Sequence, residues 1–145
     1  LKGYKDALKK HDIQYDEQLI LDITYHRDNA GQNMIKELLM MDNKITAVLI
    51  LNNNLCDGAL LGLRELNKKI PDDISLITWD DTSLNDLLGI TAIAQFPEMI
   101  GKVAATRAIK CIEERREGKQ SEKCLVRTLD TELRIRTSCR NINEV

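Results

Sequence analysis

The sequence predicts an α/β fold with a mainly parallel sheet flanked by helices. Short stretches that favour β-strands alternate with helical patterns over residues 1–94. One of these stretches, residues 45–51 (ITAVLIL), is apolar without alternation, which is typical of a strand covered on both faces. Strand–helix–strand connections are right-handed, so we expect helices on each side of the sheet.

Composition and charge exclude several classes of protein. The chain has 145 residues, enough for one ordinary domain, and a formal net charge of −2. This charge provides no basic surface for nucleic acid, which needs clustered lysine and arginine. No run of about 18 apolar residues and no signal-peptide pattern is present, so we expect a soluble, cytoplasmic protein without a membrane partner.

The first two elements are expected to be helix and strand. Residues 2–11 place apolar side chains at helical spacing among lysines. A β-favouring run follows at residues 19–24 (LILDIT), after which Asp28 or Asn29 can cap a second helix. The apolar side of that helix is formed by Met34, Ile35, Leu38, Leu39 and Met41.

A third helix is expected over residues 54–67, with apolar residues on two sides. One stripe faces a core, and Leu60 and Leu61 form a second patch, which predicts a helix covered twice. Two further strands are expected at residues 74–79 (ISLITW) and 90–94.

The longest helix is expected to begin at Pro97 and to end at Gly118. Its apolar stripe is formed by Ile100, Ala104, Ala108, Cys111 and Ile112. Residues 125–136 suggest two short strands. The last nine residues have no periodicity, and we expect this tail to be loose.

A ligand-binding site is predicted where the strands end. In parallel sheets, loops and helix N-termini converge at the carboxyl ends of the strands. The candidate ligand-binding residues there are His26, Asn52, Asp80 and Gln95. Amides, one acid and an imidazole suit a hydroxyl-rich or amide-rich small molecule. The alternative is ordinary loop composition, with an asparagine capping the next helix and His26 merely exposed.

Catalytic and metal sites are not predicted, and no cofactor is expected. Asp80 and Asp81 supply two carboxylates, but adjacent side chains usually point apart and no companion His or Glu follows at a suitable spacing. The four cysteines, Cys56, Cys111, Cys124 and Cys139, form no CxxC pair. GxSxG, P-loop, GxGxxG and HExxH strings are also missing, so an enzyme is the weaker hypothesis.

Several strings together resemble one family. Residues 70–83 (IPDDISLITWDDTS) are highly similar to a signature of LacI-type (lactose-repressor family) regulators, and GALLGLRELNKK precedes them at the usual interval. Further matches are KGYKDAL from Lys2, TAVLILNNN from Thr46, ITAIAQ from Ile90, PEMIGKVAATRAI from Pro97 and LDTELRIRTS from Leu129. Nearly the whole chain is covered by the resemblance.

The resemblance implies a division into parts of two periplasmic-binding-protein-like lobes. Residues 1–94 resemble the C-terminal effector-binding lobe, and residues 129–145 resemble its return strand and tail. Residues 95–128 resemble a segment of the N-terminal lobe. Most of that lobe and a helix-turn-helix headpiece would lie outside these 145 residues, so we expect the apolar stripe of the long helix to be uncovered here.

The resemblance also implies a function. The chain would be a small-molecule-sensing core fragment of a homodimeric transcription regulator, with a sugar or similar polar metabolite as effector and operator DNA bound only through the headpiece. Asn52 and Asp80 match effector-binding positions, and Gln95 matches a crossover residue near the ligand. His26 and Pro97 replace aromatic residues of some members, which weakens a prediction of ring stacking.

The sequence also allows two other hypotheses. A sugar-binding protein of a transport system would have the same two lobes, although the signature at residues 70–83 argues against it. A small α/β enzyme is the second alternative, and no motif supports it. The identity of the effector and the sign of its effect on DNA binding do not follow from these residues.

Overall fold

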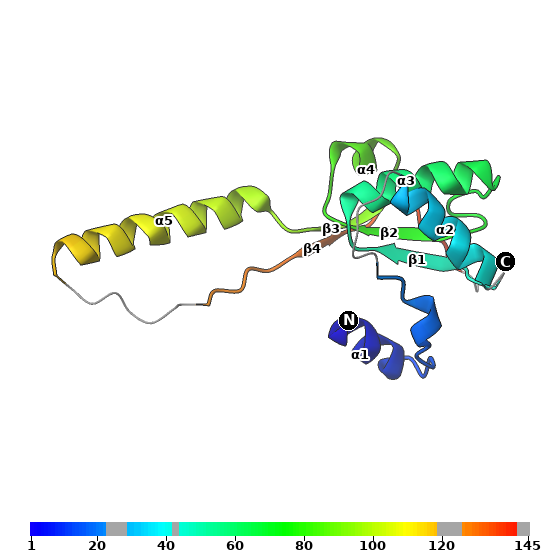
Figure 1. Ribbon diagram of the computed structural model, residues 1–145, viewed down its shortest axis with the longest axis horizontal. Helices are drawn as coiled ribbons and strands as arrows, with labels where there is room; N and C mark the ends of the chain where they lie inside the picture. The colour runs from blue at the N-terminus through cyan, green and yellow to red at the C-terminus, as the bar shows by residue number, and fades with distance from the viewer. Residues whose placement is uncertain (23–28, 42–43, 119–125, 142–145) are drawn as a thin grey trace. The chain divides into compact units, whose positions relative to one another are not determined.

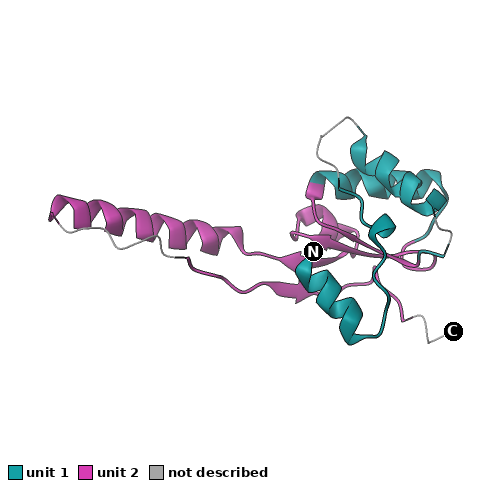
Figure 2. Ribbon diagram, turned by 60° about the horizontal axis from the view of Figure 1, so that its bottom comes forward, with its two compact units in different colours: residues 1–45, 54–69 teal, residues 46–53, 70–145 magenta. Residues whose placement is uncertain are grey.

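The computed structural model (Figure 1) describes most of the chain, namely residues 1–22, 29–41, 44–118 and 126–141. The chain divides into two compact units, which we call the helical unit and the sheet unit (Figure 2). The helical unit comprises Leu1–Ile45 and Asn54–Lys69. The sheet unit comprises Thr46–Asn53 and Ile70–Val145.

In its described residues, the helical unit contains three α-helices and a 3-10 turn. These elements are α1 (Lys2–Lys10), η1 (Glu17–Leu19), α2 (Ala30–Met41) and α3 (Asn53–Glu65), the last of which starts one residue inside the sheet unit. The predicted apolar stripe of α2 is largely buried, with Met34, Ile35 and Leu38 in the core. Met41 is exposed, because the stripe turns away from the core at the end of the helix.

Glycines bring α2 and α3 into close contact. A Cβ atom placed on Gly31 would lie 2.1 Å from the carbonyl oxygen of Leu55, and one on Gly62 would lie 2.4 Å from Cγ2 of Ile35. Gly58 is similarly tight, with 2.9 Å to the backbone nitrogen of Gln32. The GALLG string spaces Gly58 and Gly62 one helical turn apart, so both lie on the same face of α3.

The described part of the sheet unit forms one sheet of four strands in the order β1-β2-β3-β4. They are β1 (Ala47–Ile50), β2 (Ser75–Trp79), β3 (Thr91–Ala94) and β4 (Glu132–Arg134). The first three are parallel, with Val48 opposite Leu76 and Thr78 opposite Ala92, whereas β4 pairs antiparallel with β3. The mainly parallel sheet is therefore as predicted (Figure 1).

Two helices complete the sheet unit, α4 (Ser83–Leu87) and α5 (Pro97–Arg116). Pro97 occupies the first turn of α5, as predicted, and Gly118 follows the helix with a φ of 70°. No residue of α5 is buried, and Ile100 and Ile112 of its apolar stripe are exposed. No helix among the described residues has both the length and the apolar character needed to cross a membrane.

Two predictions about burial are wrong. β1 was expected to be covered on both faces, but Val48 and Ile50 are buried while Leu49 is 43% exposed. β1 lies at the edge of the sheet that the described residues form, and aliphatic residues favour strand backbone whether or not both faces are covered. The second apolar patch of α3 is also uncovered at Leu61, so the helix buries one side only.

The strand expected at residues 19–24 is not observed in its described part. Leu19 ends the η1 turn, and residues 20–22 belong to no strand. The Asp16 side chain accepts a hydrogen bond from the Gln18 backbone (2.9 Å), which fixes a turn in place of extended chain. Residues 23–28, and with them the candidate cap Asp28, lie outside the described residues.

The C-terminal segment differs from the expectation in two ways. Between residues 126 and 141, β4 is the single strand, where two were expected. The tail is also not loose at Ser138, which is 2% exposed. The Ser138 hydroxyl donates to the Leu76 carbonyl (2.5 Å) and accepts from the Thr91 amide (2.8 Å), so it satisfies backbone groups of both β2 and β3.

Candidate functional site

Two of the four predicted site residues meet at the ends of their strands. Asp80 follows β2 and Gln95 follows β3, and Gln95 donates its side-chain amide to Oδ1 of Asp80. Oδ2 of Asp80 accepts from Nδ2 of Asn53 at 3.2 Å. The Asp80 carboxylate is thus held by two neutral amides that come from the ends of two other elements.

The other two predicted residues are placed less fully. Asn52 is half-buried directly before Asn53, and its role as a ligand residue stays a prediction. His26 lies outside the described residues. Asn53 was not among the predicted site residues, because three consecutive asparagines, Asn52 to Asn54, follow β1 and the sequence alone does not show which one meets Asp80. The run of asparagines was the available signal.

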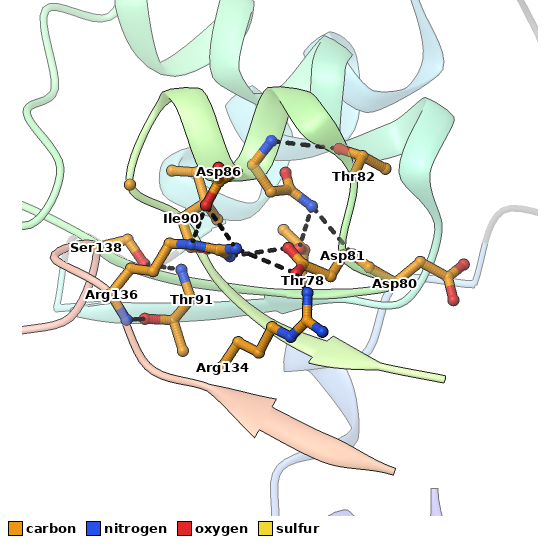
Figure 3. Close-up of polar contacts among 12 residues, drawn as sticks. Thr78, Asp80, Asp81, Thr82, Asp86, Ile90, Thr91, Arg134, Arg136 and Ser138 are labelled. Carbon is orange, nitrogen blue, oxygen red and sulfur yellow. Dashed lines mark hydrogen bonds and ion pairs between the residues drawn. The ribbon is translucent and has the colours of Figure 1, made fainter. Parts of the chain in front are cut away.

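Asp81, the neighbour of Asp80, has entirely different partners. Its carboxylate is nearly buried and accepts from Nη1 and Nη2 of Arg136 at 2.8 and 3.1 Å. Arg134 adds a third contact at 2.6 Å from its Nη1. Figure 3 shows the carboxylate of Asp81 among these guanidinium groups and that of Asp80 pointing away from them. The two acids therefore form no pair.

Arg136 connects this ion cluster to α4 and to the loop that precedes β3. Its Nη2 lies 3.0 Å from Oδ1 of Asp86, and its Nη1 donates to the Ile90 carbonyl at 2.7 Å. The hydrogen bond from Arg136, followed by that from Arg134, lowers the pKa of Asp81 despite its burial. The same contact with Asp81 raises the pKa of Arg136. Asp81 is thus a structural anion, charged at neutral pH.

This pKa shift predicts a loss of stability in acid. The pKa of Asp81 is lower in the folded chain than in the unfolded one, so its stabilising contribution is present above the unfolded value of about 3.9 and is lost as the pH falls through the folded value. Thermal unfolding should show that wild type is more stable than Asp81→Asn at pH 7 and that the difference shrinks below about pH 4. A difference that stays constant across this range would contradict the assignment.

Other candidate chemistry is sparse in the described part of the chain. No group of three or more His, Cys, Asp or Glu residues there could hold a metal ion. Cys56 is buried, and burial together with the Asp57 charge raises the pKa of its thiol to about 11, so the thiol is protonated at neutral pH. Cys124 lies outside the described residues.

A hollow of about 370 Å³ lies in the helical unit and contains none of the predicted site residues. It is lined by Lys5, Leu8, Lys9, Asp12, Ile13, Gln14 and Tyr15. The Lys5 ammonium lies 4.2 Å from the centre of the Tyr15 ring, and Tyr4 meets the same ring edge-on. These contacts fasten α1 to the segment that follows it.

Comparison with models of protein families identifies the family of this chain. The model of the periplasmic binding protein-like domain matches residues 1–139. The chain belongs to this family. The periplasmic-binding-protein-like fold predicted from the sequence is thereby confirmed.

Curated relatives of this family member are transcription regulators. The HTH-type transcriptional regulator MalR of Clostridium butyricum is 31% identical over 144 residues, which cover 98% of this chain and 41% of MalR. The HTH-type transcriptional repressor CytR of Escherichia coli K12 is also 31% identical, over 97% of this chain and 40% of CytR. The chain therefore spans about two fifths of the length of these relatives, and the resemblance to LacI-type regulators is confirmed.

Solved structures agree in fold. A LacI family transcriptional regulator from Enterococcus faecium with bound ribose has a TM-score of 0.74 at 28% identity, over 94% of this chain and 49% of that protein. A complex of the regulator CelR with cellobiose has a TM-score of 0.78 at 25% identity, over 94% of this chain and 40% of that protein. Both of these structures hold a sugar.

Proposed function

We propose that this chain is the effector-sensing part of a LacI-type bacterial transcription regulator. A sugar or similar polar metabolite would bind it and modulate the binding of operator DNA by a helix-turn-helix headpiece. The observation that carries the proposal is the Asp80 carboxylate, which is held at the strand ends by the amides of Asn53 and Gln95. Ribose and cellobiose in the related structures support a sugar as the ligand.

The chemistry of the cluster suits a ligand rich in hydroxyl groups. A carboxylate only accepts hydrogen bonds, so the amide nitrogens of Asn53 and Gln95 must face Asp80. Their orientation is thereby set before a ligand arrives, and such preorganisation reduces the entropy lost on binding. We propose Asn52, Asp80, Gln95 and His26 as ligand residues, with Asn53 added from its contact with Asp80. We also propose that the chain binds this ligand without catalysing a reaction, and that it does so in the cytoplasm.

The proposed division into lobes is supported by α5. Residues 95–128 would belong to the N-terminal lobe, and residues 1–94 and 129–145 to the C-terminal lobe. α5 has no buried residue, and its exposed apolar side chains, among them Met99 and Ile109, would be covered by the rest of the N-terminal lobe. A homodimer is proposed for the intact protein, and sedimentation would measure it.

Removing the Asp80 carboxylate should make the intact regulator insensitive to its effector. Loss of one charged hydrogen-bonding partner costs about 1.5 to 3 kcal/mol, which is roughly tenfold to more than a hundredfold in affinity. DNA affinity without effector should change little, because the response needs differential binding to two states. Titration of operator binding by the Asp80→Ala protein, with ribose and cellobiose as the first probes, measures the effect.

The matched control is Asp72→Ala, which removes the same charge from an exposed position of the sheet unit. This variant should respond to the effector like wild type. A response of Asp80→Ala at the wild-type effector concentration would show that Asp80 does not bind the ligand.

A further inference from the structure

The backbone at Asp80 has an uncommon conformation. Its φ is 66°, in the left-handed region that residues other than glycine seldom occupy. Its amide donates to the Ile93 carbonyl of β3 at 3.0 Å, so the chain turns at the end of β2 while still bonded to the neighbouring strand. A conformation of this kind persists only where surrounding contacts hold it.

Asn85 supplies such a contact from α4. Its side chain is 2% exposed, and its Nδ2 donates to the Asp80 carbonyl at 3.0 Å and to Oγ1 of Thr78 at 3.1 Å. An amide nitrogen carries two hydrogens, so these two bonds use both of them. The side chain thus links the Asp80 backbone carbonyl to the Thr78 hydroxyl, on either side of Trp79, at the point where β2 ends and the turn begins.

Asn85 is itself fixed through its backbone. Its amide donates to Oγ1 of Thr82, the N-cap residue of α4, at 3.2 Å. Its carbonyl accepts from the Ile90 amide at 2.8 Å. A buried side chain whose backbone is hydrogen-bonded at both ends has little freedom to follow a displaced partner. Asn85 therefore fixes the position of the Asp80 carbonyl, and the carbonyl does not fix the position of Asn85.

We propose that Asn85 is a positioning residue for the ligand site at Asp80. By holding the Asp80 carbonyl, it keeps that residue left-handed and keeps its carboxylate on Asn53 and Gln95. The neighbouring carboxylate of Asp81 is at the same time left to the arginines (Figure 3). This inference rests on the proposed function, in which Asp80 binds the effector, and names the residue that prepares Asp80 for it.

The first test needs no ligand. In crystal structures of the intact protein, Asn85→Ala should shift Asp80 out of the left-handed region and separate its carboxylate from Asn53 or Gln95. Ser138→Ala is the matched control, because Ser138 is equally buried and its side chain also makes two hydrogen bonds, both to backbone groups of the sheet. Both variants should lower the Tm, but Ser138→Ala should leave Asp80 unchanged.

A second variant guards against misfolding. Asn85→Ser keeps a polar side chain that is one bond too short to reach the Asp80 carbonyl, and it should reproduce the displacement of Asp80 with a smaller loss of Tm. If Asp80 keeps its φ and both amide partners in the alanine and serine variants, the proposal is overturned.

The second test uses the sugar, ribose or cellobiose, that the intact protein binds. Asn85→Ala should weaken its affinity about tenfold, Ser138→Ala should not, and Asn85→Ala should add no further loss to Asp80→Ala. Unchanged affinity in Asn85→Ala, with a loss in Asp80→Ala, would overturn the positioning role alone. Unchanged affinity in Asp80→Ala would instead overturn the proposed function, while the crystallographic comparison would still decide whether Asn85 holds Asp80.

Discussion

Replacement of Gly31 by alanine is expected to lower the free energy of unfolding by about 3 kcal/mol, the upper end of the usual cost of overpacking. The new Cβ would lie 2.1, 2.8 and 2.9 Å from the carbonyl oxygen, carbonyl carbon and Cα of Leu55. All three are backbone atoms, so no side-chain rotation relieves the clash and α2 must move away from α3. Urea denaturation of the 145-residue chain, followed by circular dichroism, measures the loss.

Gly101→Ala is the control for this substitution. Gly101 lies in α5 with nothing within 4 Å of an added Cβ. Alanine is the better helix former, so this variant should gain about 0.5 to 1 kcal/mol in its free energy of unfolding. Equal stabilities of the Gly31→Ala and Gly101→Ala proteins would contradict the close approach of α2 and α3.

Replacement of Arg136 by alanine should also cost about 3 kcal/mol, because it removes the main partner of a nearly buried carboxylate. Asp81, whose side chain is 6% exposed, would keep Arg134 alone, and the Ile90 carbonyl would lose its guanidinium donor. Chemical denaturation at pH 7 gives the value. Arg115→Ala, at an exposed position of α5, should change stability by less than about 0.5 kcal/mol.

A double variant distinguishes two contributions to the free energy of unfolding: the cost of leaving the buried Asp81 carboxylate without its partner, and the stabilisation by the ion pair itself. Replacing both partners, as Asp81→Leu with Arg136→Met, should recover part of the stability lost in Arg136→Ala, because no buried charge is then left without its partner. If the double variant is no more stable than the single one, the loss in Arg136→Ala comes from packing and not from the charge on Asp81.

Local pattern was sufficient for much of the fold. β2 and β3 lie where apolar runs end in polar residues, and Pro97 marks the start of α5 because its fixed φ suits the first helical turn. The predictions that were wrong concern which strand faces are buried and which segments pair as strands. The exposure of β1 and the presence of β4 as a single strand depend on which segments lie beside them. A local apolar run does not indicate which segments those are.

The candidate site divides in the same way. Asp80 and Gln95 were predictable because the ends of parallel strands converge at one edge, and the structure joins their side chains. The role of Asn85 was not, since its target is a backbone carbonyl whose orientation depends on a left-handed residue. The cluster around Asp81 was also missed, because Arg136 follows Asp81 only after α5 has intervened.

The position of β4 in the chain has a consequence for synthesis. β4 and Ser138 complete hydrogen bonds of β2 and β3, yet they are translated only after the whole of α5. A nascent chain that has emerged as far as Arg116 holds three parallel strands with one side of β3 open, and an open strand edge pairs readily with other polypeptides. The ribosome-bound chain therefore passes through an interval of exposure that ends when residues 132–138 leave the exit tunnel, and chaperone contact with the nascent protein would fall within that interval.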